Sequence, residues 1–309
     1  MKLNKPKFWD VPKISFWAII LLPLSFIFML VSFLRRTLKI ENKLKVPVIC
    51  VGNIYVGGTG KTPLAAEIFK IVKACGKNPG FVKKAYDYLD DEIKMLEKIG
   101  KVFTNKNRKE AINSLILSLC DVAILDDGFQ DFSIKKNLSI LCFNSKQLIG
   151  NGFIIPSGPL REGMKSINRA DCILINGSKN LQFENKIKKI NKNIKIFYSK
   201  YKIKNLDKFK NKKIVAFAGI GNPSNFFDLL KENNIKIKKI NSYPDHHSYS
   251  ENDYRYLMNE KNEDDVLLVT TEKDYFRLNE KMKQSFDYIE VDLEIENKNE
   301  FINLIKSKI

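Results

Sequence analysis

The chain has 309 residues, which is long enough for a sizeable hydrophobic core and, by length, for two domains. Its 53 Lys and Arg residues against 35 Asp and Glu residues give a formal net charge of +18, which favours an anionic partner or reflects lysine-rich solvated faces. The five cysteines are odd in number and lack metal-ligand spacing, which argues against a disulfide framework and indicates buried thiols in a reducing, cytoplasmic compartment.

The first predicted element is an apolar helix from Ile14 to Leu34. It has 21 residues without a charge, and at about 1.5 Å per residue it would cross roughly 30 Å of hydrocarbon. The alternative is a cleaved signal peptide, whose apolar region is usually about 7 to 15 residues long and is not followed by a pair such as Arg35-Arg36. Positive charge flanks both ends, so the topology stays open, and Pro23 would bend the helix or let it lie partly in the membrane interface. The sequence therefore predicts a membrane anchor over residues 1–36.

A glycine-rich turn follows, between a predicted strand and a predicted helix. Residues 46–52 (VPVICVG) suit a buried parallel strand, and residues 62–75 (TPLAAEIFKIVKAC) repeat their apolar positions at helical spacing. The stretch between them is a variant phosphate-binding loop, in which backbone N–H groups hold phosphates, a lysine reaches the terminal phosphates and a hydroxyl binds Mg²⁺. The predicted nucleotide-binding residues are Tyr55, Val56, Gly57, Gly58, Thr59, Gly60, Lys61 and Thr62.

A second buried strand is predicted within residues 121–131 (DVAILDDGFQD), and it ends at two adjacent aspartates. In enzymes with a phosphate-binding loop, a strand delivers a carboxylate to its C-terminal edge to hold Mg²⁺. Asp126 is therefore predicted to hold the metal together with Thr62. Asp127 is a candidate for catalysis, and the alternative is a solvated turn carboxylate.

The C-terminal third repeats the alternation of strand and helix. Residues 212–220 (KKIVAFAGI) and 264–271 (DDVLLVTT) indicate strands, residues 222–233 indicate a helix capped by Asn222, and Ser250 suits the start of another helix. Such alternation favours a largely parallel α/β sheet.

Six motifs in chain order resemble those of the tetraacyldisaccharide 4'-kinases, the lipid A 4'-kinases of Gram-negative envelope synthesis. They are GNIYVGGTGKTP, DDGFQ, NGFIIPSGPLRE, FAGIGNPSNFF, YPDHHSYS and TEKD, and they lie between Gly52 and Asp274. The apolar N-terminal segment also fits, so the resemblance covers nearly the whole chain. It implies an enzyme at the cytoplasmic face of the inner membrane that moves the γ-phosphoryl group of ATP, with Mg²⁺, to the 4'-hydroxyl of a tetraacyl glucosamine disaccharide 1-phosphate, giving lipid IVA.

The resemblance also implies a fold. The expected class is α/β, with an N-terminal membrane helix, a P-loop NTPase-like domain with a mainly parallel sheet over residues 37–205, and a smaller α/β domain over residues 206–309 that closes over the nucleotide. The expected partners are the membrane lipid substrate and the inner-membrane surface. Nucleic acid is not expected, because no motif beyond charge supports it.

Catalytic roles follow from the same resemblance. The family's aspartate corresponds to Asp91, with Asp90 one register away, and its histidine lies in the pair His246-His247. Two neighbours in an extended loop point different ways, and we take His246 as the partner of Asp91. The expected catalytic residues are Asp91, Asp127, His246 and Lys61.

Other motif positions give weaker expectations. Lys84 stands where the family often has an arginine, in a shorter loop, and Asp131 replaces a histidine, which leaves that position without an assigned role. Arg161 and Arg169 are candidates to neutralise a phosphate or to pair with a neighbouring carboxylate. Glu272 and Lys273 follow a predicted strand and are candidates for the nucleotide side.

The alternative function is a membrane-tethered P-loop ATPase that uses hydrolysis to switch partner binding. The stretch VGGTGKT resembles the KGGxGKT loops of that class, but Val56 stands where their signature lysine would be. The sequence therefore favours the kinase.

Overall fold

The computed structural model describes residues 5–11, 13–39, 41–85, 90–261 and 265–309. The chain forms two compact units, each built from separate stretches of sequence. Unit 1 comprises Met1–Ala85, Ile99–Lys200 and Ile295–Ile309, and unit 2 comprises Tyr86–Lys98 and Tyr201–Glu294. The domain boundaries expected at residues 36 and 205 stay predictions.

The N-terminal apolar segment of unit 1 differs from the single helix that the sequence predicts. After a short 3₁₀ turn, η1 (Lys7–Trp9), it forms α1 (Phe16–Ile20) and α2 (Leu22–Thr37), which are separated at Leu21. Pro23 accounts for the break, because it has no N–H to donate to the carbonyl four residues earlier and its ring crowds that carbonyl. No helix among the described residues combines the length and the apolar character that a membrane span requires. The prediction of one continuous helix is therefore wrong, and the membrane anchor over residues 1–36 stays a prediction.

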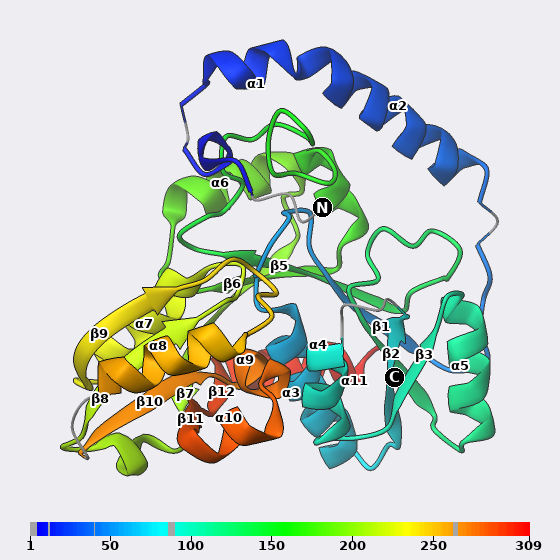
Figure 1. Ribbon diagram of the computed structural model, residues 1–309. Helices are drawn as coiled ribbons and strands as arrows, with labels where there is room; N and C mark the ends of the chain where they lie inside the picture. The colour runs from blue at the N-terminus through cyan, green and yellow to red at the C-terminus, as the bar shows by residue number, and fades with distance from the viewer. Residues whose placement is uncertain (1–4, 12, 40, 86–89, 262–264) are drawn as a thin grey trace. The chain divides into compact units, whose positions relative to one another are not determined.

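A mainly parallel sheet organises unit 1 (Figure 1). Its strands are β1 (Val48–Gly52), β2 (Pro79–Lys84), β3 (Val102–Asn105), β4 (Val122–Asp126), β5 (Leu138–Asn144), β6 (Cys172–Asn176), β7 (Lys195–Ile203) and β12 (Val291–Ile295), in the order β12-β7-β6-β5-β1-β4-β2-β3. Strands β7 and β12 also carry the chain from one unit to the other. The two predicted strands before the glycine turn and before the aspartates are confirmed as β1 and β4, and both are fully buried.

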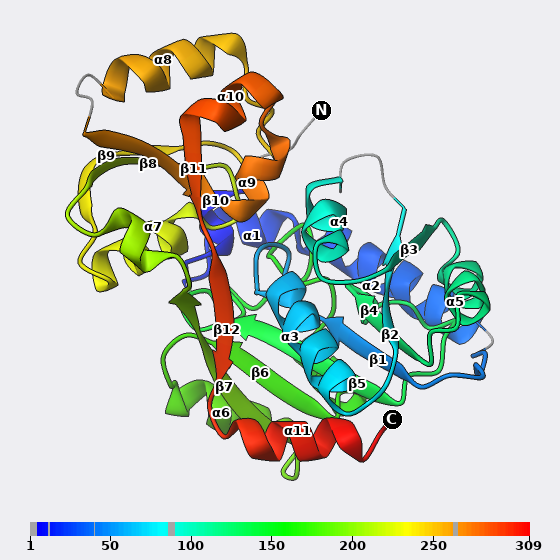
Figure 2. The same cartoon turned by 90° about the horizontal axis from the view of Figure 1, so that it is seen from below.

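Helices cover this sheet. They are α3 (Lys61–Ala74), α5 (Arg108–Leu117), the 3₁₀ segment η2 (Met164–Arg169), α6 (Leu181–Ile190) and α11 (Lys298–Lys306). Helix α3 packs on β1, β2 and β4 and also contacts α11 (Figure 2). Because β1 pairs with β4 on one side and β5 on the other, its C-terminal end lies where the chain order of the strands reverses. Ligand-binding loops gather at such a point in open α/β sheets.

Unit 2 is a smaller α/β layer structure. Its strands β8 (Lys213–Ala218), β9 (Lys236–Ser242), β10 (Val266–Thr271) and β11 (Phe286–Ile289) form a parallel sheet in the order β11-β10-β8-β9. Its helices are α4 (Asp90–Glu97), the 3₁₀ turn η3 (Leu206–Phe209), α7 (Pro223–Glu232), α8 (Glu251–Lys261), α9 (Glu272–Arg277) and α10 (Glu280–Ser285).

The two faces of the sheet in unit 2 bury different clusters, as the alternation of side chains along a strand requires. On β8, Ile214 and Ala216 pack with Phe227 of α7, whereas Val215 and Phe217 pack with the side of α8 and α10. The sequence prediction of two strands and intervening helices is confirmed here as β8, α7, α8 and β10.

Two predicted helix caps have different outcomes. Ser250 caps α8, since its hydroxyl accepts the N–H of Asp253 at 3.2 Å while the Asp253 carboxylate accepts the N–H of Ser250 at 2.7 Å. Asn222 occupies the N-cap position of α7, but its side chain makes no capping hydrogen bond. Instead its Oδ1 accepts the hydroxyl of Ser224, so the predicted capping bond is wrong.

Candidate active site

The glycine-rich loop in unit 1 joins β1 to the N-terminus of α3, as a phosphate-binding loop must. Gly57 and Gly60 have φ angles of 131° and 90°, which L side chains rarely adopt, so these two positions require glycine. Asn53 supports the loop from inside, because its amide donates to the carbonyl of Tyr55 at 2.6 Å and to the hydroxyl of Thr59 at 3.0 Å. The sequence analysis missed Asn53.

Tyr55 and Val56 form the stem of this loop. The Tyr55 side chain is buried, and its hydroxyl bonds with Asp10 and Lys5. The N–H of Val56 donates to the carbonyl of Pro159 at 2.8 Å and is thus engaged within the protein. The nucleotide-binding roles of these two residues stay predictions.

Asp126, the last residue of β4, lies beside the loop. The pairing of β1 with β4 places Val51 opposite Asp126, and the hydroxyl of Thr62 donates to Asp126 Oδ2 at 3.0 Å. The same oxygen accepts the ammonium of Lys83 at 2.6 Å, and both side chains of this ion pair are buried. Asp126 Oδ1 is buried without a hydrogen-bond partner among the described residues. A buried carboxylate oxygen without a donor is a group that a bound cation would satisfy.

Asp127 faces two cations. Arg161 NH1 lies 3.1 Å from Asp127 Oδ1, and Lys61 Nζ lies 3.9 Å from Oδ2. Burial acts to raise the pKa of Asp127, but Lys61, Arg161 and Lys83 together hold it below its ordinary value. The carboxylate is therefore ionised at neutral pH. Arg161 was expected to neutralise a phosphate or to pair with a neighbouring carboxylate, and in the structure it pairs with the carboxylate of Asp127.

Arg108 fixes the turn that carries Asp127. Its NH2 donates to the carbonyl of Asp127 at 2.6 Å, and its NH1 donates to Asp131 Oδ2 at 3.1 Å. Asp131 Oδ1 in turn accepts the hydroxyl of Ser133 at 2.5 Å. The residue that departs from the family pattern thus holds an arginine, a role that the sequence did not reveal.

Arg169 also pairs within the protein. Its guanidinium bonds with Glu162 and lies 4.4 Å from the centroid of the Phe129 ring. Phe129 is fully buried, so its ring is part of the hydrophobic core.

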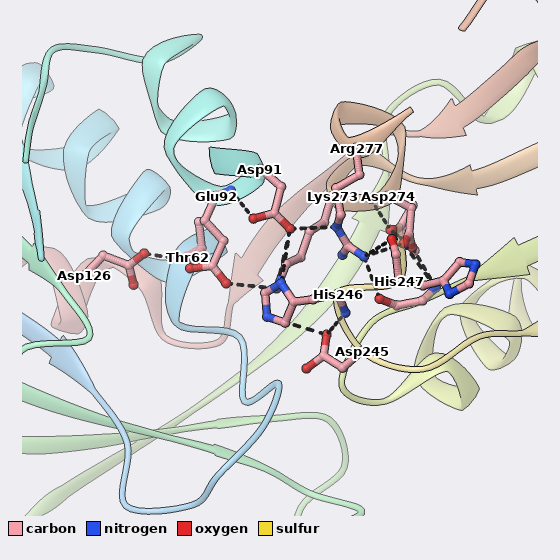
Figure 3. Close-up of polar contacts among 12 residues, drawn as sticks. Thr62, Asp91, Glu92, Asp126, Asp245, His246, His247, Lys273, Asp274 and Arg277 are labelled. Carbon is pink, nitrogen blue, oxygen red and sulfur yellow. Dashed lines mark hydrogen bonds and ion pairs between the residues drawn. The ribbon is translucent and has the colours of Figure 1, made fainter. Parts of the chain in front are cut away.

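Asp91 is the centre of a second cluster, which lies in unit 2 (Figure 3). Its carboxylate is buried at the N-terminal end of α4, with Arg277 Nε at 2.8 Å from Oδ2, His246 Nδ1 at 3.7 Å and Lys273 Nζ at 4.0 Å. Lys273 also pairs with Glu92 at 2.9 Å, and Glu272 pairs with Lys98 at 3.1 Å. The side chain of Asp90 and residues 86–89, which include most of the shortened loop, lie outside the described part of the structure.

The two histidines point in different directions, as predicted (Figure 3). His246 has a left-handed φ of 56° and turns its imidazole toward Asp91. His247 stacks on Tyr243 with ring centroids 4.6 Å apart and contacts Asp253 through Nε2 at 3.1 Å. His246 is therefore the histidine that accompanies Asp91.

The surroundings of His246 favour its neutral form. Burial and the ammonium of Lys273 lower the pKa of His246, opposed by the carboxylates of Asp245 and Asp91, and Arg277 lowers it further. The net pKa lies below the ordinary value of histidine. At neutral pH the imidazole can thus accept a proton.

Comparison with known proteins identifies the family. The family model described as tetraacyldisaccharide-1-P 4'-kinase matches residues 17–94 and 85–309. The chain belongs to this kinase family. A tetraacyldisaccharide 4'-kinase of Pelagibacter ubique is 42% identical over 99% of this chain and 98% of its own length, and one of Rickettsia canadensis is 35% identical over 100% and 97%.

A solved structure supports the same assignment. The crystal structure of Aquifex aeolicus LpxK in complex with ATP matches with a TM-score of 0.72 and 26% identity, covering 94% of this chain and 98% of that one. The α/β fold class of the kinase is thereby confirmed.

The kinase brings its predicted residues together in two groups. Unit 1 gathers Lys61, Thr62, Asp126 and Asp127, and unit 2 pairs Asp91 with His246. Lys83 and Arg277 were missed. A lysine inside a buried strand was the available signal for Lys83, because lysines are seldom buried without a partner. Only its spacing from Asp274, three residues earlier on α9, could have pointed to Arg277.

Proposed function

We propose that this kinase transfers the γ-phosphoryl group of ATP to the 4'-hydroxyl of tetraacyldisaccharide 1-phosphate and so forms lipid IVA. The observation that carries the proposal is the set of contacts in unit 1, where the lysine and threonine of the glycine-rich loop meet the aspartates at the end of β4. This is the arrangement that phosphoryl transfer requires for positioning and charge stabilisation.

The nucleotide side uses the loop and its neighbours. The N-terminus of α3 and the backbone of residues 57–62 would hold the phosphates, and Lys61 would reach the terminal ones. Thr62 and Asp126 would hold Mg²⁺, which fits the partnerless Oδ1 of Asp126. When bound, Mg²⁺ supplies positive charge to the β- and γ-phosphates.

Asp127 has a separate role at the same edge. Its ionised carboxylate holds Arg161 and Lys61 in place, so both cations stay near the position where negative charge develops. The lowered pKa of Asp127 keeps this arrangement intact at neutral pH.

The acceptor side uses the pair in unit 2. The 4'-oxygen attacks the γ-phosphorus as the bond from that phosphorus to the ADP oxygen breaks, and the hydroxyl proton passes to His246. Asp91 faces Nδ1 of the imidazole, which orients the ring and stabilises its protonated form. A base of this kind typically contributes about 10² to 10⁴ in rate.

We also propose that the kinase works at the cytoplasmic face of the inner membrane, with α1 and α2 lying in the membrane interface. The support is the exposure of their large apolar side chains, including Phe16 at 72%, Trp17 and Phe26 at 63% and Phe33 at 59%. Surface-bound helices bury such side chains among headgroups and acyl chains. The two helices would then contact the acyl chains of the lipid substrate in the membrane interface.

The test is phosphorylation of tetraacyldisaccharide 1-phosphate by MgATP in detergent micelles. We expect product from the wild type and losses of about 10² or more in kcat for Lys61→Ala, Asp91→Ala and His246→Ala. ATP binding should survive in Asp91→Ala and His246→Ala, because these side chains act on the acceptor.

The matched control is His247→Gln, which changes the neighbouring histidine. It should retain most of the activity once its thermal unfolding is shown to be cooperative. ATP hydrolysis by the wild type without phosphorylated lipid would contradict the proposal and favour a P-loop ATPase.

A further inference from the structure

Arg277, near the end of α9, connects several parts of the site in unit 2. Its Nε donates to Asp91 Oδ2 at 2.8 Å, and its NH1 donates to the carbonyl of Gly219 at 2.9 Å. NH1 also donates to the carbonyl of His247 at 3.5 Å. One guanidinium thus reaches α4, the end of β8 and the histidine loop, which we define as residues 243–250.

Asp274 holds this guanidinium in place. Its carboxylate is fully buried and lies 3.2 Å from Arg277 NH1. It also accepts the N–H of Gly219 at 3.1 Å and the hydroxyl of Tyr249 at 3.0 Å. Because these partners come from β8 and the histidine loop, the arginine is fixed before any substrate binds.

The carbonyl of Gly219 joins the arginine to His246. It accepts Arg277 NH1 at 2.9 Å and the backbone N–H of His246 at 3.1 Å. The second bond helps to hold His246 in its left-handed conformation, which costs free energy for a residue with a side chain. Displacement of the guanidinium would therefore disturb the backbone hydrogen bond between His246 and Gly219.

The same guanidinium also determines the orientation of Asp91. The distance from Asp91 Oδ2 to Arg277 Nε is 2.8 Å, whereas the distance to His246 Nδ1 is 3.7 Å. Asp91 Oδ1 accepts the N–H of Glu92 at 2.8 Å. With both oxygens engaged, the carboxylate has little freedom to turn away from the imidazole.

We propose that Arg277 is a positioning residue, which fixes Asp91 against the histidine loop and sets the charge environment of His246. The inference rests on the proposed roles of Asp91 and His246. Arg277 itself contacts neither the substrate nor the transferred group in this scheme; it acts through these two residues.

The charges around His246 agree with this role. The charged groups that act on it are Asp91 from α4, Lys273 and Arg277 from α9, and Asp245 from its own loop. Glu92 and Asp274 pair with the two cations. Burial and the two cations lower the pKa of His246, and the carboxylates of Asp245 and Asp91 raise it. Removal of one cation should therefore move the titration of His246 to higher pH.

The experiment measures that titration directly. The chain has only two histidines, so NMR spectra of histidine-labelled protein contain two imidazoles, and His247→Gln identifies the signal of His246. In Arg277→Gln we expect the midpoint of His246 to rise. The acidic limb of kcat against pH should move in the same direction, and kcat should fall about tenfold to a hundredfold. KM for MgATP should change by less than about twofold, since nucleotide binding is assigned to unit 1.

Two further variants separate charge from geometry. Arg277→Lys keeps the charge but cannot bridge Asp91 and Gly219 with one planar fork, so the midpoint of His246 should stay near that of the wild type while kcat still falls several-fold. Lys281→Gln removes a cation that is 59% exposed and pairs with Glu251, and it should change neither quantity.

The outcomes that overturn the inference are distinct from failure of the proposed function. A wild type without lipid phosphorylation would end the proposed function, yet the titration of His246 would still decide the role of Arg277. An unchanged midpoint in Arg277→Gln would overturn the inference. If Arg277→Gln does not fold, unchanged kcat in Arg277→Lys would overturn it.

Discussion

Two non-glycine residues with left-handed backbone, Asp127 and His246, carry proposed functions. Their φ angles are 62° and 56°, and hydrogen bonds from elsewhere hold both turns, from Arg108 to the carbonyl of Asp127 and from the N–H of His246 to Gly219. Such conformations persist only where the surroundings over-determine them, and they cluster at active sites. The local backbone thus supports the assignment of both side chains independently of any motif.

The buried ion pair between Lys83 and Asp126 gives a prediction at this scale. Lys83→Met removes the ammonium, so that among the described residues the hydroxyl of Thr62 is the remaining hydrogen-bond donor to the fully buried carboxylate. We expect the free energy of unfolding to fall by about 3 to 5 kcal/mol, measured as the shift of the urea midpoint.

The double variant Lys83→Met/Asp126→Asn is its control. Removal of the negative charge as well should restore much of the stability but not the kinase activity, because the proposed metal ligand is lost. Equal urea midpoints for the wild type and Lys83→Met would contradict this prediction, because they would show that the ammonium of Lys83 does not stabilise the folded state.

Among the elements, α2 combines one buried serine with a largely exposed apolar surface. Ser25 on α2 is buried, and its hydroxyl donates to the carbonyl of Ile154 at 2.8 Å while accepting the N–H of Ser157 at 3.0 Å. The apolar side chains around it stay exposed. Ser25 is thus the buried attachment of α2 to unit 1, whereas the large apolar side chains of this helix are exposed.

This arrangement predicts binding to lipid vesicles through exposed aromatic side chains. The double variant Phe26→Asp/Phe33→Asp should reduce cosedimentation with anionic phospholipid vesicles by at least about tenfold, because each charge opposes burial in the interface. Trp17 provides a second readout, since its fluorescence should shift to shorter wavelength on binding in the wild type alone.

Leu181→Asp is the matched control for this prediction. Leu181 on α6 is 71% exposed, so the change adds a charge at an equally open apolar position outside the segment. Equal vesicle binding by the wild type and the Phe26/Phe33 variant would contradict an interfacial role for α2.

Periodicity was sufficient to predict the elements that position the site. The strands before the glycine turn and before Asp126 are short apolar runs, and α3 repeats its apolar positions at helical spacing, so β1, β4 and α3 follow from local sequence. Hydropathy predicts one N-terminal helix in which Pro23 causes a bend, but the structure divides this helix into α1 and α2, because Pro23 has no N–H to donate to the preceding turn.

Sequence alone could predict only those residues of the candidate site that lie within a recognised motif. Lys61 and Thr62 lie in such motifs, and they contact Asp127 and Asp126 respectively. Arg108 and Arg277 meet their carboxylates through contacts between distant stretches of sequence, and a single sequence contains no signal for these pairs.

For the whole molecule, MgATP should stabilise the kinase through the loop of unit 1. A ligand at about 100 times its Kd stabilises the folded state by about 2.7 kcal/mol, which calorimetry detects as a higher unfolding temperature. Lys61→Ala should lose most of this gain at the same MgATP concentration. An equal gain in both proteins would place the nucleotide elsewhere.

The interleaving of the two units along the chain has a consequence for synthesis. Residues 295–309 belong to unit 1, where α11 packs on α3 and Lys298 pairs with Glu67 at 2.7 Å (Figure 2). The ribosome makes the glycine-rich loop early, yet the helix behind it receives this support only when the last residues emerge. Unit 1, most of which is translated first, therefore completes its contacts only after unit 2 has been made.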